Sequence, residues 1–274
     1  MKKRPIIFIH VPKTAGTTIN HILKNQYKKR FYVDAFNFDE SCEAFKNFSK
    51  EERDSFQLIQ GHSALKLARF VDNPVLITFL RDPVDLVLSD YYYIKRATWN
   101  GFHSEVKKMN TLMEFVEFVK EKGYDNLQTR HLSLDSLTDP EREKPKRGEI
   151  DQLFEMAKWN LNRIDFVFTT DQFDAAVVTL MKRLNWNKMP LYTKKNRTEN
   201  RLSVSELDES TRASIEKLNQ FDVRLYNLAK ERNDYVKEAE KVEEFVSLNA
   251  KYQHSNKLMR WVLEHRHRNV NLQN

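Results

Sequence analysis

The chain has 274 residues, of which 40% are hydrophobic and 12% aromatic, a composition that excludes a disordered protein and allows one large α/β domain or two small ones. Its 46 Lys and Arg residues exceed its 39 Asp and Glu residues, and the net charge of +7 favours an anionic partner: a nucleotide, a sulfated or carboxylated glycan, nucleic acid or a membrane surface. The single cysteine, Cys42, excludes an intrachain disulfide and favours a reducing compartment.

The first predicted element is a strand that begins at Ile6 and stops at Pro12, a short apolar run rich in β-branched residues. The chain then passes Pro12 and a series of small residues, and a helical pattern begins near Ile19. A strand–turn–helix of this kind directs backbone N–H groups and the positive end of a helix at one point, which is typical of a phosphate site. Lys13 adds a positive charge there. An ordinary turn with a solvated lysine is the alternative.

Strands and helices alternate along the rest of the chain. Further strands are predicted at 31–33, 56–60, 75–80 and 165–169, and helices at 83–96, 111–122, 153–161, 173–184 and, as one long helix, through 218–228. The alternation predicts an α/β fold with a central parallel sheet covered by helices on both faces. Ligands of such sheets bind beyond the carboxyl ends of the strands, which brings Lys13, His62 and Arg81 together.

A second phosphate-binding element is predicted at the end of the strand 75–80. Arg81 follows this strand, and Ser89 lies two turns along the helix that comes next. A planar guanidinium suits bidentate contacts with phosphate, and a hydroxyl can donate to the same group. In the alternative, Arg81 pairs locally with Asp82 or Asp85 and the serine faces solvent.

The two motifs together resemble a known family. Pro-Lys-Thr-Ala-Gly-Thr-Thr at 12–18 resembles the 5′-phosphosulfate loop of sulfotransferases that use 3′-phosphoadenosine 5′-phosphosulfate (PAPS), and Arg-Asp-Pro, the later serine and Tyr-Tyr-Tyr resemble their 3′-phosphate element. The resemblance covers roughly residues 5–230 and is greatest to the branch of the heparan sulfate 2-O-sulfotransferases and their bacterial relatives. It implies a three-layer, P-loop-like fold with a catalytic domain at 1–232. Residues 233–274 are then a helical C-terminal extension, packed on that domain or projecting from it, with Val242, Val246, Leu258 and Trp261 as apolar anchors.

His62 is the predicted general base. A sugar hydroxyl needs a proton acceptor, and a histidine with an ordinary pKa of ~6.5 is mostly neutral at pH 7. Its position after Gly61, at a strand end, is similar to that of the family's catalytic histidine. A structural histidine is the alternative, in which case His10 and His131 are the next candidates.

Two more segments take their predicted roles from the resemblance. The polar run 194–201 lies where relatives place a loop over the nucleotide, so nucleotide contacts are expected from Lys195, Thr198 and Arg201; a charged surface loop is the alternative. Residues 125–130 resemble a segment that often lies on the acceptor side.

The resemblance implies an enzyme that transfers a sulfuryl group from PAPS to a hydroxyl of a glycan by in-line displacement, with no metal required. Lys13 would neutralise the leaving group, and Arg81 and Ser89 would hold the 3′-phosphate. The remaining loop residues would cradle the 5′-phosphate: Pro12, Thr14, Ala15, Gly16, Thr17 and Thr18.

Two other classes of function stay open. A P-loop kinase or other NTP-using enzyme is disfavoured because Lys13 precedes Gly16, whereas a Walker A loop ends in Gly-Lys-Ser/Thr. A non-enzymatic anion or nucleic-acid binder would use the positive charge alone; the resemblance implies no nucleic-acid partner. The first apolar run is too short for a signal peptide or a membrane span, so a cytoplasmic protein is expected: either a bacterial or viral relative of the Golgi enzymes or a trimmed catalytic domain.

Overall fold

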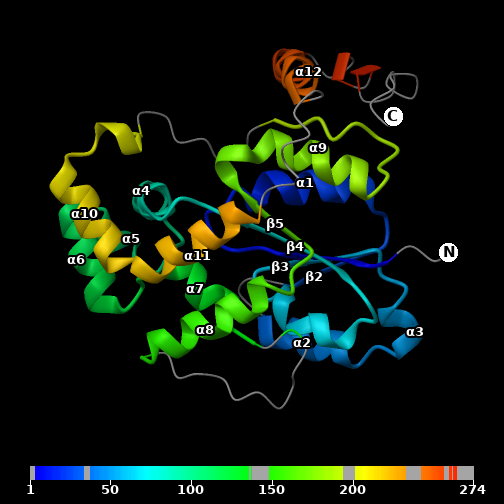
Figure 1. Ribbon diagram of the computed structural model, residues 1–274, viewed down its shortest axis with the longest axis horizontal. Helices are drawn as coiled ribbons and strands as arrows, with labels where there is room; N and C mark the ends of the chain where they lie inside the picture. The colour runs from blue at the N-terminus through cyan, green and yellow to red at the C-terminus, as the bar shows by residue number, and fades with distance from the viewer. Residues whose placement is uncertain are drawn as a thin grey trace.

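The computed structural model describes residues 4–33, 38–135, 137, 148–193, 201–232, 242–255, 259–260 and 262–263. Within these residues one parallel sheet has the strand order β2-β3-β1-β4-β5 (Figure 1). Its strands are β1 (Ile6–Ile9), β2 (Arg30–Val33), β3 (Leu58–Gly61), β4 (Val75–Leu80) and β5 (Phe166–Thr169). This confirms the predicted α/β fold class, and β1 lies at the centre of the sheet.

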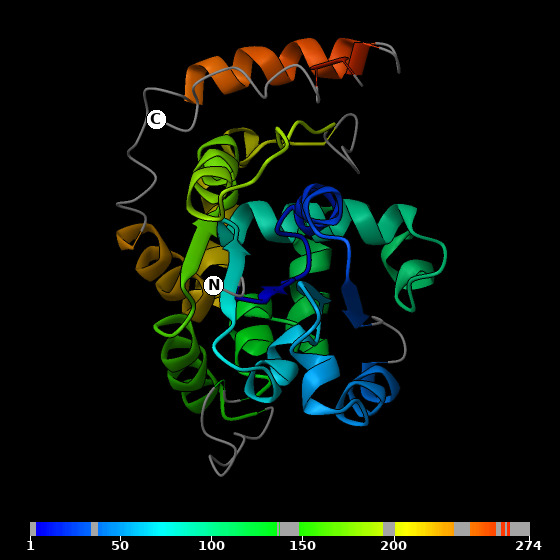
Figure 2. The ribbon, with the colours of Figure 1, turned by 90° about the vertical axis from the view of Figure 1, so that its right-hand side faces the viewer.

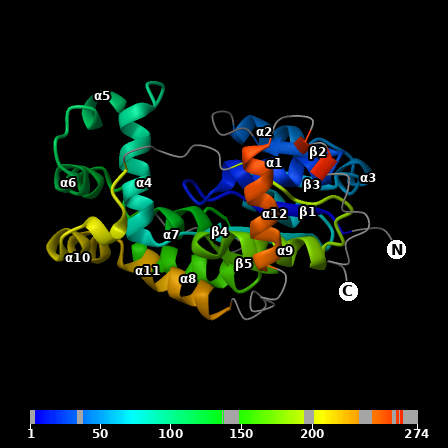
Figure 3. The same cartoon turned by 90° about the horizontal axis from the view of Figure 1, so that it is seen from above.

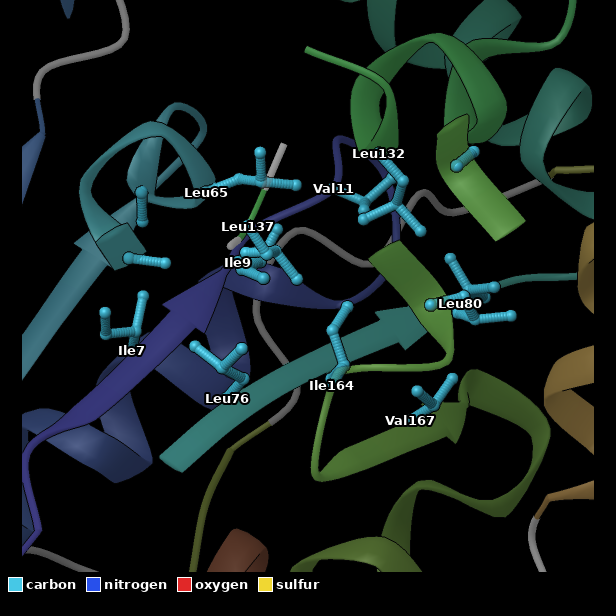
Figure 4. Close-up of a cluster of buried hydrophobic side chains, with 14 of the residues drawn as sticks. Ile7, Ile9, Val11, Leu65, Leu76, Leu80, Leu132, Leu137, Ile164 and Val167 are labelled. Carbon is cyan, nitrogen blue, oxygen red and sulfur yellow. The ribbon is translucent and has the colours of Figure 1, made fainter. Parts of the chain in front are cut away.

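Helices cover both faces of the sheet because β1 and β4 are apolar on both sides. Ile6 and Phe8 pack towards the face that carries α1 (Gly16–Gln26), α9 (Phe173–Arg183) and α12 (Val242–His254). Ile7 and Ile9 pack towards the opposite face (Figure 4). That face carries α2 (Phe38–Lys46), the 3₁₀ helix η1 (Ala64–Phe70), α7 (Leu127–Leu132), α8 (Ile150–Leu161) and α11 (Gln220–Glu231). Figure 2 shows the two helical layers with the sheet between them.

A separate helical cluster lies beyond the carboxyl ends of the strands (Figure 3). It comprises α4 (Pro83–Arg96), α5 (His103–Val106), α6 (Leu112–Lys122) and α10 (Glu209–Leu218), packed around Tyr91, Phe115 and Ile215. Asp82 caps α4 by accepting from the N–H groups of Val84 and Asp85, each at 3.0 Å. The cap and the following proline fix where the helix leaves β4, and so which α4 side chains face the sheet end.

The helix predicted through 218–228 is confirmed from Gln220 onward, but it does not include Leu218. Two helices, α10 and α11, meet at Asn219, whose ψ of 33° breaks the helical path. The Asn219 side-chain oxygen accepts from the N–H of Asn126 at 2.9 Å, and the Asn126 oxygen accepts from the N–H groups of Phe221 and Asp222 at 2.9 and 3.1 Å. These reciprocal bonds cap α11 and attach it to the segment before α7. Short elements that the sequence did not predict include α3 (Lys50–Arg53), η2 (Thr170–Gln172) and η3 (Val204–Glu206).

Helix α12 packs on α9 through Phe245 and Tyr252, which are both buried. Val246, a predicted anchor, is 43% exposed. The other predicted anchors are Val242, which is partly buried in the same cluster, and Leu258 and Trp261, which lie outside the described residues. In the part of the chain that the structure describes, no helix has the length and apolar character to cross a membrane.

Candidate active site

The turn after β1 has an unusual backbone. Lys13 and Ala15 both adopt left-handed conformations, with φ of 64° and 61°. Two threonine hydroxyls hold the turn in place: Thr14 donates to the carbonyl of Val11 at 2.8 Å, and Thr78 donates to the carbonyl of Ile9 at 2.9 Å. The turn therefore leads directly into the first turn of α1, where the positive end of the helix dipole lies. This geometry suits an anion.

Gly16 is required at the start of α1 because a histidine ring lies against it. A Cβ at this position would lie 1.7 Å from Nε2 of His10. The His10 ring is itself stacked between Phe8 and His62, with centroid distances of 5.7 and 4.1 Å, so it has little room to move. Because Gly16 has no side chain, the start of α1 can lie against the His10 ring.

Lys13 lies on the ring of Tyr93, with Nζ 3.6 Å from the ring centroid. Burial lowers the pKa of Lys13 to about 8; the carboxylate of Asp90 opposes this shift, and Arg81 adds to it. Burial likewise raises the pKa of Asp90 to about 6. Asp90 was not predicted as a site residue, and Tyr93 was included only in the Tyr-Tyr-Tyr motif; helical spacing from Ser89 places both near the same face of α4.

Arg81 connects the lysine turn to α4. Its Nη1 donates to the carbonyl of Lys13 at 2.9 Å and its Nε donates to Asp85 at 2.6 Å. The local pair with Asp85 is therefore present, together with a contact to the turn that the sequence did not indicate. The Nη2 of Arg201 donates to the other carboxylate oxygen of Asp85. Burial lowers the pKa of both arginines to about 10, so both stay charged at neutral pH.

Two pockets adjoin at Arg81. The first, of about 600 Å³, contains Lys13, His62 and Asp90. The second, of about 640 Å³, contains Arg201, with the rings of Phe173 and Tyr192. Both pockets share Ala15, Thr18, Arg81 and Ser89. Arg81 therefore lies where the two pockets meet, with Lys13 in the first pocket and Arg201 in the second. This arrangement suits a ligand that carries negative groups in its middle and an aromatic group at one end.

His62 is held in one tautomer. Its Nδ1 lies 2.8 Å from the carbonyl oxygen of His10, and because a carbonyl only accepts, Nδ1 carries the proton and Nε2 is the basic nitrogen. Burial lowers the pKa of His62 below 6.5, which corrects the unperturbed value assumed from the sequence. His10 also lines the first pocket, and burial lowers its pKa well below 6.5. His131 does not line either pocket, and its pKa is lowered to about 3 by burial.

Most predicted site residues lie together. The first pocket is lined by Pro12, Lys13, Ala15, Gly16, Thr17, Thr18, His62, Arg81 and Ser89. Thr14 is buried and serves the turn instead, and Arg201 lines the second pocket. Lys195 and Thr198 lie outside the described residues.

The segment 125–130 has a mixed role. Leu127 lines the first pocket, whereas the Gln128 side chain pairs with both backbone groups of Arg81 at 2.8 and 2.9 Å. Buried Asp222 accepts from the N–H groups of Gln128 and Thr129 at 3.0 and 2.7 Å. These bonds fix the start of α7 beside the pocket. Within the described residues, no group of three His, Cys, Asp or Glu side chains is arranged to hold a metal ion.

Comparison with known proteins gives a consistent picture. A model of the sulfotransferase family matches residues 1–229. The chain is 27% identical to heparan-sulfate 6-O-sulfotransferase 2 of Gallus gallus, covering 86% of this chain and 69% of that protein. It is 26% identical to heparan-sulfate 6-O-sulfotransferase 2 of Homo sapiens, covering 82% of this chain but 44% of that protein. Against heparan-sulfate 6-O-sulfotransferase 1 of Homo sapiens the identity is 27%, over 87% of this chain and 69% of the relative. These relatives carry the 6-O name and not that of the 2-O branch which the motifs resemble.

Proposed function

The chain belongs to the sulfotransferase family, and we propose that it transfers a sulfuryl group from PAPS to a hydroxyl group of a carbohydrate. The observation that carries this proposal is the junction of the two pockets at Arg81, with Lys13 in the first pocket and Arg201 in the second. PAPS has a 5′-phosphosulfate and a 3′-phosphate on one ribose. Its two anionic groups and its adenine therefore match a site with cationic residues at its middle and aromatic rings in the second pocket.

The residues of the junction divide into two sets. The turn 12–18 and the start of α1 would hold the 5′-phosphate through backbone N–H groups and threonine hydroxyls. Arg81 and Ser89 would hold the 3′-phosphate, with Arg201 close by. The Asp85 carboxylate pairs with both guanidinium groups, so a 3′-phosphate would bind them in competition with Asp85.

PAPS supplies a sulfuryl group, whose bond to the phosphate oxygen breaks as the acceptor oxygen bonds to sulfur. Lys13 is charged at neutral pH and would neutralise the leaving phosphate oxygen, an interaction that strengthens as the bond breaks. His62, neutral and with Nε2 unprotonated, would accept the proton of the acceptor hydroxyl. The protein thus supplies position, charge and a proton acceptor.

A carbohydrate acceptor is supported by the relatives, which are named as sulfotransferases of heparan sulfate. The pocket that holds the proposed base is also bordered by aromatic and amide side chains, including Phe102, Tyr124 and Asn100. Side chains of these types border many sites for polar organic ligands.

Calorimetric titration with PAP, the desulfonated product, and with AMP and ATP tests the donor assignment. The wild-type protein should bind PAP more tightly than AMP by roughly ten- to a hundredfold, because a charge-assisted contact to the 3′-phosphate contributes ~1.5–3 kcal/mol. Arg81→Ala should remove most of this preference. Because Arg81 also holds the turn, Ser89→Ala is the matched variant: it should weaken PAP binding and leave AMP binding unchanged. Equal wild-type affinities for PAP and AMP, or a preference for ATP, would contradict the proposal.

A further inference from the structure

Aromatic side chains surround the outer side of the first pocket. Tyr93, Phe102 and Tyr124 line it, and Trp99 lies just outside the lining residues 100–102. The rings contact one another in pairs: Trp99 meets Tyr93 edge-on at 6.2 Å, and Phe102 meets Tyr124 edge-on at 5.1 Å. Trp99 is 68% exposed and Tyr124 is 43% exposed. Two aromatic rings near the first pocket are therefore exposed to solvent.

The exposed tryptophan is held by an ordered turn. The turn between α4 and α5, at the end of the molecule shown in Figure 3, is closed by backbone bonds from Asn100 to Ala97 and from His103 to Asn100, both at 2.9 Å. The Asn100 side chain accepts from the N–H of Phe102 at 2.9 Å, and the His103 ring bonds to the carbonyl of Ile94 at 2.9 Å. The indole is thus presented outward on a turn that is fixed at several points, which lowers the entropy cost of binding a ligand.

Trp99 is connected to Lys13 through the ring of Tyr93. Tyr93 carries the Lys13 ammonium on its ring and the Trp99 ring against its edge. Trp99 is therefore two side-chain contacts from the charge proposed to act on the leaving group, yet it does not line the reaction pocket itself. A ligand group on the indole would lie next to the reacting group and outside the pocket that holds it.

We propose that Trp99 is a stacking platform for a sugar ring that neighbours the sulfated ring, so that the enzyme acts on oligosaccharide chains and not on single sugars. This inference rests on the carbohydrate acceptor proposed above. A pyranose ring has an apolar C–H face that packs on an aromatic ring and a hydroxyl edge that stays in water, which matches a ring exposed beside an open pocket. A neighbouring ring is required because the indole lies outside the reaction pocket. Binding to this platform contributes to acceptor affinity and leaves the donor contacts unchanged.

Steady-state kinetics with size-graded heparan sulfate oligosaccharides and PAPS test the platform. Trp99→Ala should raise KM for long acceptors roughly tenfold with kcat nearly unchanged, since stacking and apolar burial are lost only in binding. Trp99→Phe should restore most of the affinity. Val246→Ala, which removes an exposed apolar side chain from α12, is the control. Affinity for PAP should be the same in all four proteins, and the wild type should use a monosaccharide with a much higher KM than a long chain.

The outcomes separate the platform from the proposed function. Normal sulfuryl transfer with an unchanged KM in Trp99→Ala would overturn the platform and leave the function standing. The same holds if wild-type KM does not depend on chain length. Binding of the oligosaccharides in the presence of PAP, measured by calorimetry, gives a readout independent of turnover and should show the same Trp99 dependence. If the wild type sulfates a hydroxyl-bearing peptide but no glycan, both the carbohydrate assignment and the platform fall.

Discussion

The pH dependence of kcat/KM tests the electrostatics of the site, because kcat/KM reports the groups of the free enzyme. His62 must be neutral to accept a proton, and burial lowers its pKa below 6.5, so activity should fall only on the acid side of that value. Lys13 must be charged, and its pKa is about 8, so activity should also fall above pH 8. One pH unit beyond each pKa, the required form is about tenfold scarcer. A bell-shaped profile is expected, with its acid limb below pH 6.5 and its alkaline limb centred near pH 8.

Asp90→Asn is the perturbation that makes this test specific. The Asp90 carboxylate raises the pKa of Lys13, whereas burial and neighbouring arginines lower it. Removing this carboxylate should therefore move the alkaline limb to lower pH, and the acid limb, which His62 sets, should stay where it is. Asp90 is itself charged only above about pH 6, the range in which the effect on Lys13 is measured. Asp151→Asn, on α8, is the control. The assay is labelled sulfuryl transfer across pH 5–10 at limiting PAPS. An alkaline limb at the same pH in Asp90→Asn and wild type would refute the reasoning.

Two further variants test the turn itself. Lys13→Ala should lower turnover much more than it weakens PAP binding, because its charge is needed most as the leaving group forms; the opposite pattern in kinetics and calorimetry would make it a binding residue. Gly16→Ala should destabilise the protein by ~1–3 kcal/mol, the usual cost of overpacking, and should reduce PAP binding, because the new Cβ would lie 1.7 Å from the His10 ring. Thermal unfolding and PAP titration measure both effects, and an unchanged melting temperature would show that the ring moves freely.

Local patterns were sufficient to predict the sheet and the position of the site. The run 75–80 is apolar except for Thr78 and forms β4 with the predicted bounds. Parallel strands end at one edge, so Lys13, His62 and Arg81 meet there by topology alone. The break at Asn219 could not be predicted, since it depends on bonds to Asn126, 93 residues away in the sequence.

The roles of individual side chains depended on contacts that no local pattern contains. Gly16 reads as a flexible turn residue, but its importance comes from the His10 ring against it. The tautomer of His62 follows from a carbonyl 52 residues away, and the lowered pKa of Lys13 follows from burial between α4 and the turn. Asp90 was missed because an acidic residue on a charged helix usually faces solvent.

The central claim, sulfuryl transfer from PAPS to a glycan, is tested most directly by incubating the protein with PAPS labelled in its sulfate and with heparan sulfate oligosaccharides. The wild type should transfer label to the glycan. His62→Ala should transfer roughly 10²–10⁴-fold less, the usual contribution of a positioned base, while its affinity for PAP stays nearly the same. Near-normal transfer by His62→Ala would assign the base to another residue, with His10 next in the pocket. An absence of labelled glycan with the wild-type protein would contradict the account.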